Sequence, residues 1–110
     1  MNTKKSITEL YSKKGSMGTK GINMMIEKLN TIVGKRFTTV DDIKSYIINL
    51  FSDYDLSKMC IGEVECPDFD EGDYFIDANL HEDGTGNTDF ELWCIYTRQN
   101  KIYITDWDFM

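Results

Sequence analysis

The sequence predicts an α+β fold in which two N-terminal helices pack on a four-stranded antiparallel β-sheet arranged as a meander. The prediction depends on the spacing of apolar residues. Up to Phe51 they recur at intervals of three and four, as on one side of a helix, and from Met59 onward they alternate with a period of two. The polar segments between the predicted elements are short, which favours antiparallel neighbours. A chain of 110 residues suffices for one domain and is too short for two.

The first 18 residues are predicted to form a basic arm, and residues 19–110 a single α+β domain. The arm contains four lysines and few apolar residues. Its stretch from Ser6 to Glu9 has the capping-box pattern of a short helix, which would be marginal on its own. We therefore expect that residues 1–18 can be removed without unfolding the domain.

The first helix is predicted over residues 20–33, and Gly34 follows it where a left-handed C-cap residue is expected. The second helix begins after Thr39 and carries Asp41 and Asp42 in its first turn, where the helix dipole favours carboxylates. Each helix has one apolar stripe, which should face the sheet. The stripes are Ile22, Met25, Ile26, Leu29, Ile32 and Val33 in the first helix, and Val40, Ile43, Tyr46, Ile47, Leu50 and Phe51 in the second.

Four strands are predicted, over residues 59–66, 73–81, 89–97 and 102–109. The third is apolar on both alternating faces, so we place it in the middle of the sheet, covered on both sides. One face of the sheet would form the core with the helices. For the second face the chain supplies no cover except the N-terminal arm, so its apolar residues form an exposed patch or, if the register differs, join the core. These residues are Phe75, Trp93, Ile95, Tyr103, Trp107 and Phe109.

No stretch of the sequence matches a catalytic or cofactor-binding motif. His81 and Cys94 would make a base–nucleophile pair only if the strands brought them together, and nothing in the local sequence supports this. The G-x-G stretch Gly84 to Gly86 lies between strands rather than before a helix, as a phosphate loop would. We therefore predict that the protein is not an enzyme and binds no cofactor.

The residues that could ligate a metal also lack a known spacing. Cys60, Cys66, Cys94 and His81 are zinc-ligand types, but no close cysteine pair is present, so we expect reduced thiols. The acids around Gly72 would suit calcium, but they do not follow the EF-hand pattern. We therefore predict no metal site.

The charge is unevenly distributed along the chain. Residues 1–36 hold eight basic residues against two acids, a net +6, and residues 37–110 hold four basic residues against seventeen acids, a net −13, which together give −7. A domain this acidic repels nucleic acid and anionic membranes and attracts basic proteins. The simpler alternative is that the charge serves only solubility. The N-terminus has no apolar core after its lysines, so no signal peptide is predicted and the expected location is cytoplasmic.

The acids gather on the predicted strands and their turns. Carboxylates two residues apart on one strand lie about 6.6 Å from each other, so a single row falls short of duplex DNA, which carries one charge per roughly 1.7 Å of axis. Mimicry of DNA would need two or three rows side by side on adjacent strands. The predicted partner-binding residues are Glu63, Glu65, Asp68, Asp70, Glu71, Asp73, Glu82, Asp83, Asp106 and Asp108, with Trp93 and Trp107.

In size and charge the chain is similar to small acidic α+β proteins of phages and mobile elements, such as anti-restriction and anti-CRISPR proteins. This likeness is one of profile and no motif carries it. It implies a non-enzymatic inhibitor of a nucleic-acid-binding enzyme, whose partner is a basic host nuclease. Two alternatives fit the same residues: an immunity protein that neutralises a basic toxin, and an oligomeric protein whose aromatic face is a homodimer interface.

Overall fold

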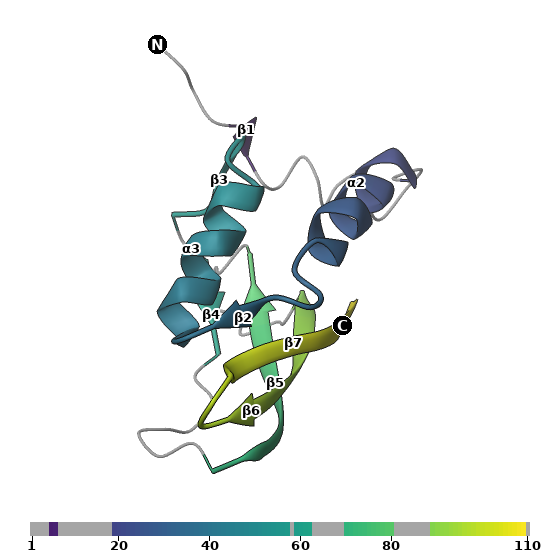
Figure 1. The fold of residues 1–110 in the computed structure, drawn as a ribbon. Helices are drawn as coiled ribbons and strands as arrows, with labels where there is room; N and C mark the ends of the chain where they lie inside the picture. The colour runs from purple at the N-terminus through teal and green to yellow at the C-terminus, as the bar shows by residue number, and fades with distance from the viewer. Residues whose placement is uncertain (1–4, 7–18, 58, 63–69, 81–88, 110) are drawn as a thin grey trace.

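The computed structural model describes residues 5–6, 19–57, 59–62, 70–80 and 89–109, and the fold below refers to these residues (Figure 1). They form an α+β fold with two helices and an antiparallel sheet of five strands in the order β2-β7-β6-β5-β4. The predicted class and antiparallel sheet are therefore confirmed, with one strand more than predicted. Both helices lie on one side of the sheet (Figure 1). No helix in the described part of the chain is long and apolar enough to cross a membrane.

Helix α2 spans Thr19–Asn30, and its apolar stripe faces the core. Met25 and Leu29 are fully buried. Two stripe predictions are wrong: Ile26 is half-buried, and Val33 is 39% exposed. Val33 departs from the predicted stripe because the helix ends three residues before it, so the helical spacing no longer determines where its side chain lies.

The chain turns at Gly34 and then runs along the edge of the sheet. Gly34 has a φ of +87°, the left-handed conformation predicted for it. Its N–H donates to the Ile104 carbonyl at 2.8 Å, and Ile104 in turn donates to the Lys35 carbonyl at 3.0 Å. This pairing leads into β2, Arg36–Phe37, which lies antiparallel to β7. A strand of two residues is too short for a period of two to appear in the sequence, which is why it was not predicted.

Helix α3 spans Val40–Leu50 and begins with a complete capping box. The Thr39 hydroxyl accepts from the Asp42 N–H at 3.2 Å, and the Asp42 carboxylate accepts from the Thr39 N–H at 3.2 Å. Its stripe residues Ile43 and Ile47 are fully buried, as predicted. At the other end, Lys28 of α2 donates to the Leu50 carbonyl at 2.8 Å, which ties the two helices together.

Three long strands make up most of the sheet: β5 (Gly72–Asn79), β6 (Phe90–Thr97) and β7 (Lys101–Phe109). The strand β6 lies in the centre, as predicted. Of the first predicted strand, residues 59–66, the structure shows β4, Cys60–Ile61. Residues 63–69 lie outside the described part of the chain. The inner face of the sheet packs under the helices and is fully buried at Ile76, Ala78, Phe90, Leu92, Ile102 and Ile104.

A second, two-stranded sheet joins the N-terminal region to the domain. Its strand β1, Lys5–Ser6, runs parallel to β3, Tyr54–Asp55. Ser6, the first residue of the predicted capping box, is therefore part of a strand, and the short helix predicted after it falls on residues that the structure does not describe. Residues 7–18 lie outside the described part of the chain.

A β-bulge at Thr105 determines the face on which the end of β7 presents its side chains. Ile104 pairs with Cys94, whereas Asp106 pairs with Trp93, so Thr105 is an extra residue in β7. Its hydroxyl donates to the Trp93 carbonyl at 3.1 Å. An extra residue reverses the alternation beyond it. The bulge therefore moves every side chain after Thr105 to the face opposite the one that strict alternation gives.

Two sequence predictions are corrected by this bulge. Trp107 and Phe109 were expected on the second face with Trp93, but they pack against the core from the inner face. Trp107 pairs with buried Leu92 and Phe109 with buried Phe90. The expectation that the middle strand is covered on both sides is also wrong, because its outward side chains remain accessible.

Candidate partner-binding face

We call the side of the sheet away from the helices the outer face. Strand pairing aligns its side chains in three rows that run across the strands. Residues directly opposite each other on paired strands point to the same side, with Cβ atoms about 4.5–5.5 Å apart. The rows are Asp77–Glu91–Asp108, then Phe75–Trp93–Asp106, then Asp73–Ile95–Tyr103–Arg36.

The centre of the outer face is apolar and accessible. Phe75 is 61% exposed, Trp93 37% and Ile95 40%. The Phe75 and Trp93 rings meet edge to face, with centroids 6.0 Å apart. The indole N–H of Trp93 donates to a Glu91 carboxylate oxygen at 2.9 Å, which fixes the ring beside the acids. Clustered, oriented aromatic side chains of this kind are typical of interaction surfaces.

One end of the apolar centre is bordered by a row of carboxylates. Asp77, Glu91 and Asp108 lie directly opposite one another on three adjacent strands. Asp106, beside Trp93, adds a fourth acid in the next row. Like charges placed opposite each other destabilise a sheet by roughly 0.2–1 kcal/mol per pair. The row therefore opposes folding, and cations of a partner placed over it would offset that cost.

The opposite end of the outer face carries positive charge. The Arg36 guanidinium lies over the Tyr103 ring, 5.6 Å from its centroid. Lys101 begins β7 in the left-handed conformation, with a φ of 59°, and pairs with Thr97. Five acids and these two bases give the outer face a net charge of −3 and an acidic end distinct from a basic corner.

The predicted partner-binding residues fall in different places. Asp73, Asp106, Asp108 and Trp93 lie together on the outer face. Trp107 does not join them: its indole N–H donates to Asn30 Oδ1 at 2.9 Å on the helix side. Asp70 and Glu71, just before β5, are exposed. The other predicted acids lie outside the described residues: Glu63, Glu65, Asp68, Glu82 and Asp83.

Glu71 has a structural role at the start of β5. Its carboxylate accepts from the backbone N–H of Arg98, which lies in the turn between β6 and β7, at 2.9 Å. The Tyr74 hydroxyl donates to the Asp70 carbonyl at 2.7 Å. These two contacts secure the approach to β5, so Glu71 is less available to a partner than the acids of the outer face.

Two residues of the acidic row, Asp77 and Glu91, were missed at the sequence level. Each lies in a predicted strand, two residues from a residue already assigned to the second face and therefore on that same face. Asp77 follows Phe75, and Glu91 precedes Trp93. The alternation therefore contained the signal. The position of Asp106 and Asp108 beside them could not be predicted, because it depends on the bulge.

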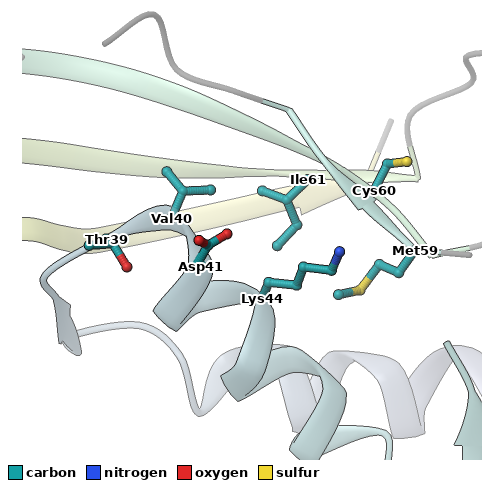
Figure 2. Close-up of a pocket in the computed structure, with 7 residues that line it drawn as sticks. All are labelled: Thr39, Val40, Asp41, Lys44, Met59, Cys60 and Ile61. Atoms are coloured by element: carbon teal, nitrogen blue, oxygen red, sulfur yellow. The ribbon is translucent and has the colours of Figure 1, made fainter. Parts of the chain in front are cut away.

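A pocket of about 360 Å³ lies between the start of α3 and β4 (Figure 2). Its lining residues are Thr39, Val40, Asp41, Lys44, Met59, Cys60 and Ile61. Figure 2 shows Lys44 extending toward Met59, whereas the Cys60 thiol points away from the other lining side chains. Among the described residues that line the pocket, none places a base beside the Cys60 thiol.

The buried thiol of Cys94 is also unsuited to nucleophilic chemistry. Burial, with a smaller effect of the Asp73 charge, raises its pKa from the ordinary value of 9.0 to about 11. A reactive thiol needs a lowered pKa, because the thiolate is the nucleophile. Its Sγ donates to the Tyr74 carbonyl at 3.5 Å, and His81 lies outside the described residues.

Among the described residues, no group of three or more His, Cys, Asp or Glu side chains could hold a metal ion. No known protein-family model matches the chain, and no curated protein or solved structure was found to match it. The geometry of the outer face is therefore the main basis for a functional proposal.

Proposed function

We propose that this chain is a non-enzymatic acidic binding protein that inhibits a nucleic-acid-binding enzyme by occupying its basic groove. The observation that carries the proposal is the alignment of Asp77, Glu91 and Asp108 across three strands, next to Asp106. Such proteins include inhibitors of the anti-restriction and anti-CRISPR kinds from phages and mobile elements. The partner would be a basic host protein, and the site would be the outer face.

The charge spacing across the outer face supports competition with nucleic acid. From Asp73 to Asp77 the strand β5 advances about 13 Å. Five carboxylates over that length correspond to about one charge per 2.6 Å of axis, against roughly one per 1.7 Å for duplex DNA. The carboxylates of three adjacent strands together thus reach a charge density that those of a single strand do not. The density is below that of DNA, so the apolar centre would have to supply part of the affinity.

The apolar centre distinguishes this face from a purely electrostatic one. Exposed Trp and Phe at the middle of a surface, ringed by polar residues, resemble the binding hot spots of protein interfaces. Phe75, Trp93 and Ile95 hold that place on the outer face. An immunity protein that neutralises a basic toxin would use the same chemistry, and only the partner's activity distinguishes the two functions.

A homodimer through the outer face is the less favoured alternative. Two copies placed face to face would bring a net charge of −3 from each into one interface. Like-charge juxtaposition across an interface costs several kcal/mol. The charges therefore favour a basic partner over a second copy of this chain.

The test measures whether the protein displaces nucleic acid from a captured partner. We expect the wild-type protein to release labelled nucleic acid from the partner, and the release to weaken steeply with salt. The variant Asp108→Lys should release less, whereas Asp53→Lys, the same charge change after α3, should behave as wild type. A partner that binds this protein and nucleic acid simultaneously, each with unchanged affinity, would refute the inhibitory function.

A further inference from the structure

We propose that the outer face seats an amphipathic helix of the partner in one fixed orientation, with cations over Asp77, Glu91 and Asp108. This inference rests on the proposed function, because it assumes a basic protein partner on this face. An apolar side chain of the helix would contact Phe75 and Trp93. The end of the helix that lacks cations would lie at Arg36 and Lys101.

The spacing of the rows defines where the helix must place its side chains. Successive rows are two residues apart along the strands, or about 6.6 Å. One turn of an α-helix rises 5.4 Å, so residues three or four apart on one helix side match a step between rows. A Lys or Arg one turn before an apolar residue would thus reach Glu91 while the apolar residue reaches Trp93. A helix also suits the width of this face, since its diameter of about 10 Å covers the three strands that carry the rows.

The charges at the two ends of the outer face determine the orientation. Asp77, Glu91 and Asp108 attract the cationic end of the helix. At the other end, Arg36 and Lys101 outnumber the single carboxylate of Asp73, so the net charge there repels it. In the reverse orientation the helix cations would approach Arg36 while the acidic row stayed unpaired. Like-charge contacts of this kind disfavour the reverse orientation, in addition to the attraction that favours the stated one.

The apolar centre supplies the contact that electrostatics alone cannot. The Trp93 ring is already held by its hydrogen bond to Glu91 and by the edge of Phe75, so binding need not immobilise it. A preorganised aromatic side chain loses little conformational entropy on binding, which raises the affinity. A cation placed over Glu91 also lies near the Trp93 ring, where a cation–π contact is favourable.

The test uses short helical peptides and the full-length, isotope-labelled protein. The first peptide has arginines one turn from a leucine near one end, with a nitroxide label at the arginine end. A second peptide replaces the arginines with glutamates, and a third replaces the leucine with glutamine. We expect amide shift changes at Phe75, Trp93 and Ile95 with the first peptide, and binding at least about tenfold weaker with the other two.

The nitroxide reports the orientation. Its broadening should be strongest at Asp77, Glu91 and Asp108 and weakest at Arg36 and Lys101. The Trp93→Ala variant should bind at least about tenfold more weakly while its thermal unfolding stays close to wild type, because the side chain is exposed. Ile95→Ala repeats the comparison without removing the Glu91 hydrogen bond.

Several outcomes would overturn the inference: no binding at the highest peptide concentration, shift changes at the pocket beside α3, or the strongest broadening at Arg36. Equal binding of the arginine and glutamate peptides would do the same. Failure here is distinguishable from failure of the proposed function. If the peptide binds in the expected orientation but the partner keeps its affinity for nucleic acid, only the inhibitory function is rejected. If the protein displaces nucleic acid from the partner but the peptide does not bind in this orientation, only the present inference is rejected.

Discussion

The two faces of the sheet are built on the same three strands and follow opposite rules. On the inner face, apolar residues such as Leu92 and Ile104 are fully buried under the helices. On the outer face, Trp93 and its neighbours stay accessible, and acids oppose acids across the strands. The inner face follows from the need to bury apolar surface. The outer face does not, and the difference indicates that its residues serve something other than the stability of the fold.

In strand β7, the bulge determines which residues lie on each face. Before the bulge, Ile102 and Ile104 point inward; after it, Trp107 and Phe109 do so. Because the bulge accommodates Thr105 as an extra residue, Trp107 and Phe109 stay in contact with the core. Asp106 and Asp108 then lie on the outer face, where Asp108 completes the acidic row.

Adding a residue at the bulge should cause the largest loss. Insertion of one alanine after Thr105 would shift the alternation beyond the bulge by one position and turn Asp106 and Asp108 toward the core. We expect a loss above about 4 kcal/mol, close to the whole stability of a small domain, measured by urea unfolding. The control Thr105→Ala keeps the residue and removes only its hydroxyl, with an expected loss of about 0.5–1.5 kcal/mol. An insertion variant as stable as this control would show that the register at the bulge does not separate the faces.

The next effect compares two apolar residues of one segment. Leu29→Ala should lower the free energy of unfolding by about 2–5 kcal/mol, because Leu29 is fully buried beneath the sheet. Val33→Ala should change it by no more than about 0.5 kcal/mol, because Val33 is 39% exposed. Equal losses in urea unfolding would contradict the burial of the α2 stripe against the inner face.

Cys94 allows the inner face to be probed by pH. Its pKa is about 11 in the folded protein against the ordinary 9.0, so the unfolded chain loses the proton first as pH rises. The unfolding free energy should therefore fall between about pH 9 and 11, with the full stability present below pH 9. The measurement is the difference in unfolding free energy between wild type and Cys94→Ala, in which contributions common to both proteins cancel. Parallel pH curves for the two proteins would contradict the burial of this thiol.

A smaller effect is expected in the acidic row. Asp108→Asn removes repulsion with Glu91 and should raise the stability by about 0.2–1 kcal/mol. The gain should shrink as salt is added, because surface charges are screened. Asp53→Asn, the same change away from the row, should show no gain. A destabilised Asp108→Asn protein at low salt would mean that the row contributes to the fold after all.

The sequence predicted the elements better than it predicted the faces. Helix α3 and the central position of β6 follow from strong local signals: acids in the first turn after Thr39, and a strand that is apolar on both sides. The edge strand β2 has only two residues and leaves no periodic pattern. It forms because Gly34 turns the chain onto β7, a tertiary effect that local propensity does not encode.

The candidate site was predicted in part for the same reason. Asp73 was assigned to it as one of the acids gathered near the first turn, and Trp93 by alternation, which holds as long as a strand is regular. The bulge breaks that regularity in β7, which is why Trp107 was placed on the wrong face. A single inserted residue is decided by pairing with the neighbouring strand, so the sequence of one strand cannot locate it.

The central claim is that the outer face, and not the acidic segment before β5, binds the partner. The measurement is the affinity of a captured partner for three proteins: wild type, a triple Asp77→Lys, Glu91→Lys and Asp108→Lys variant, and a variant in which Glu63, Glu65, Asp70 and Glu71 are changed to lysine. We predict that the triple variant binds at least about tenfold more weakly, with its unfolding still cooperative, and that the second variant loses less. Full affinity in the triple variant would contradict the account and leave the outer acids as a solvated surface.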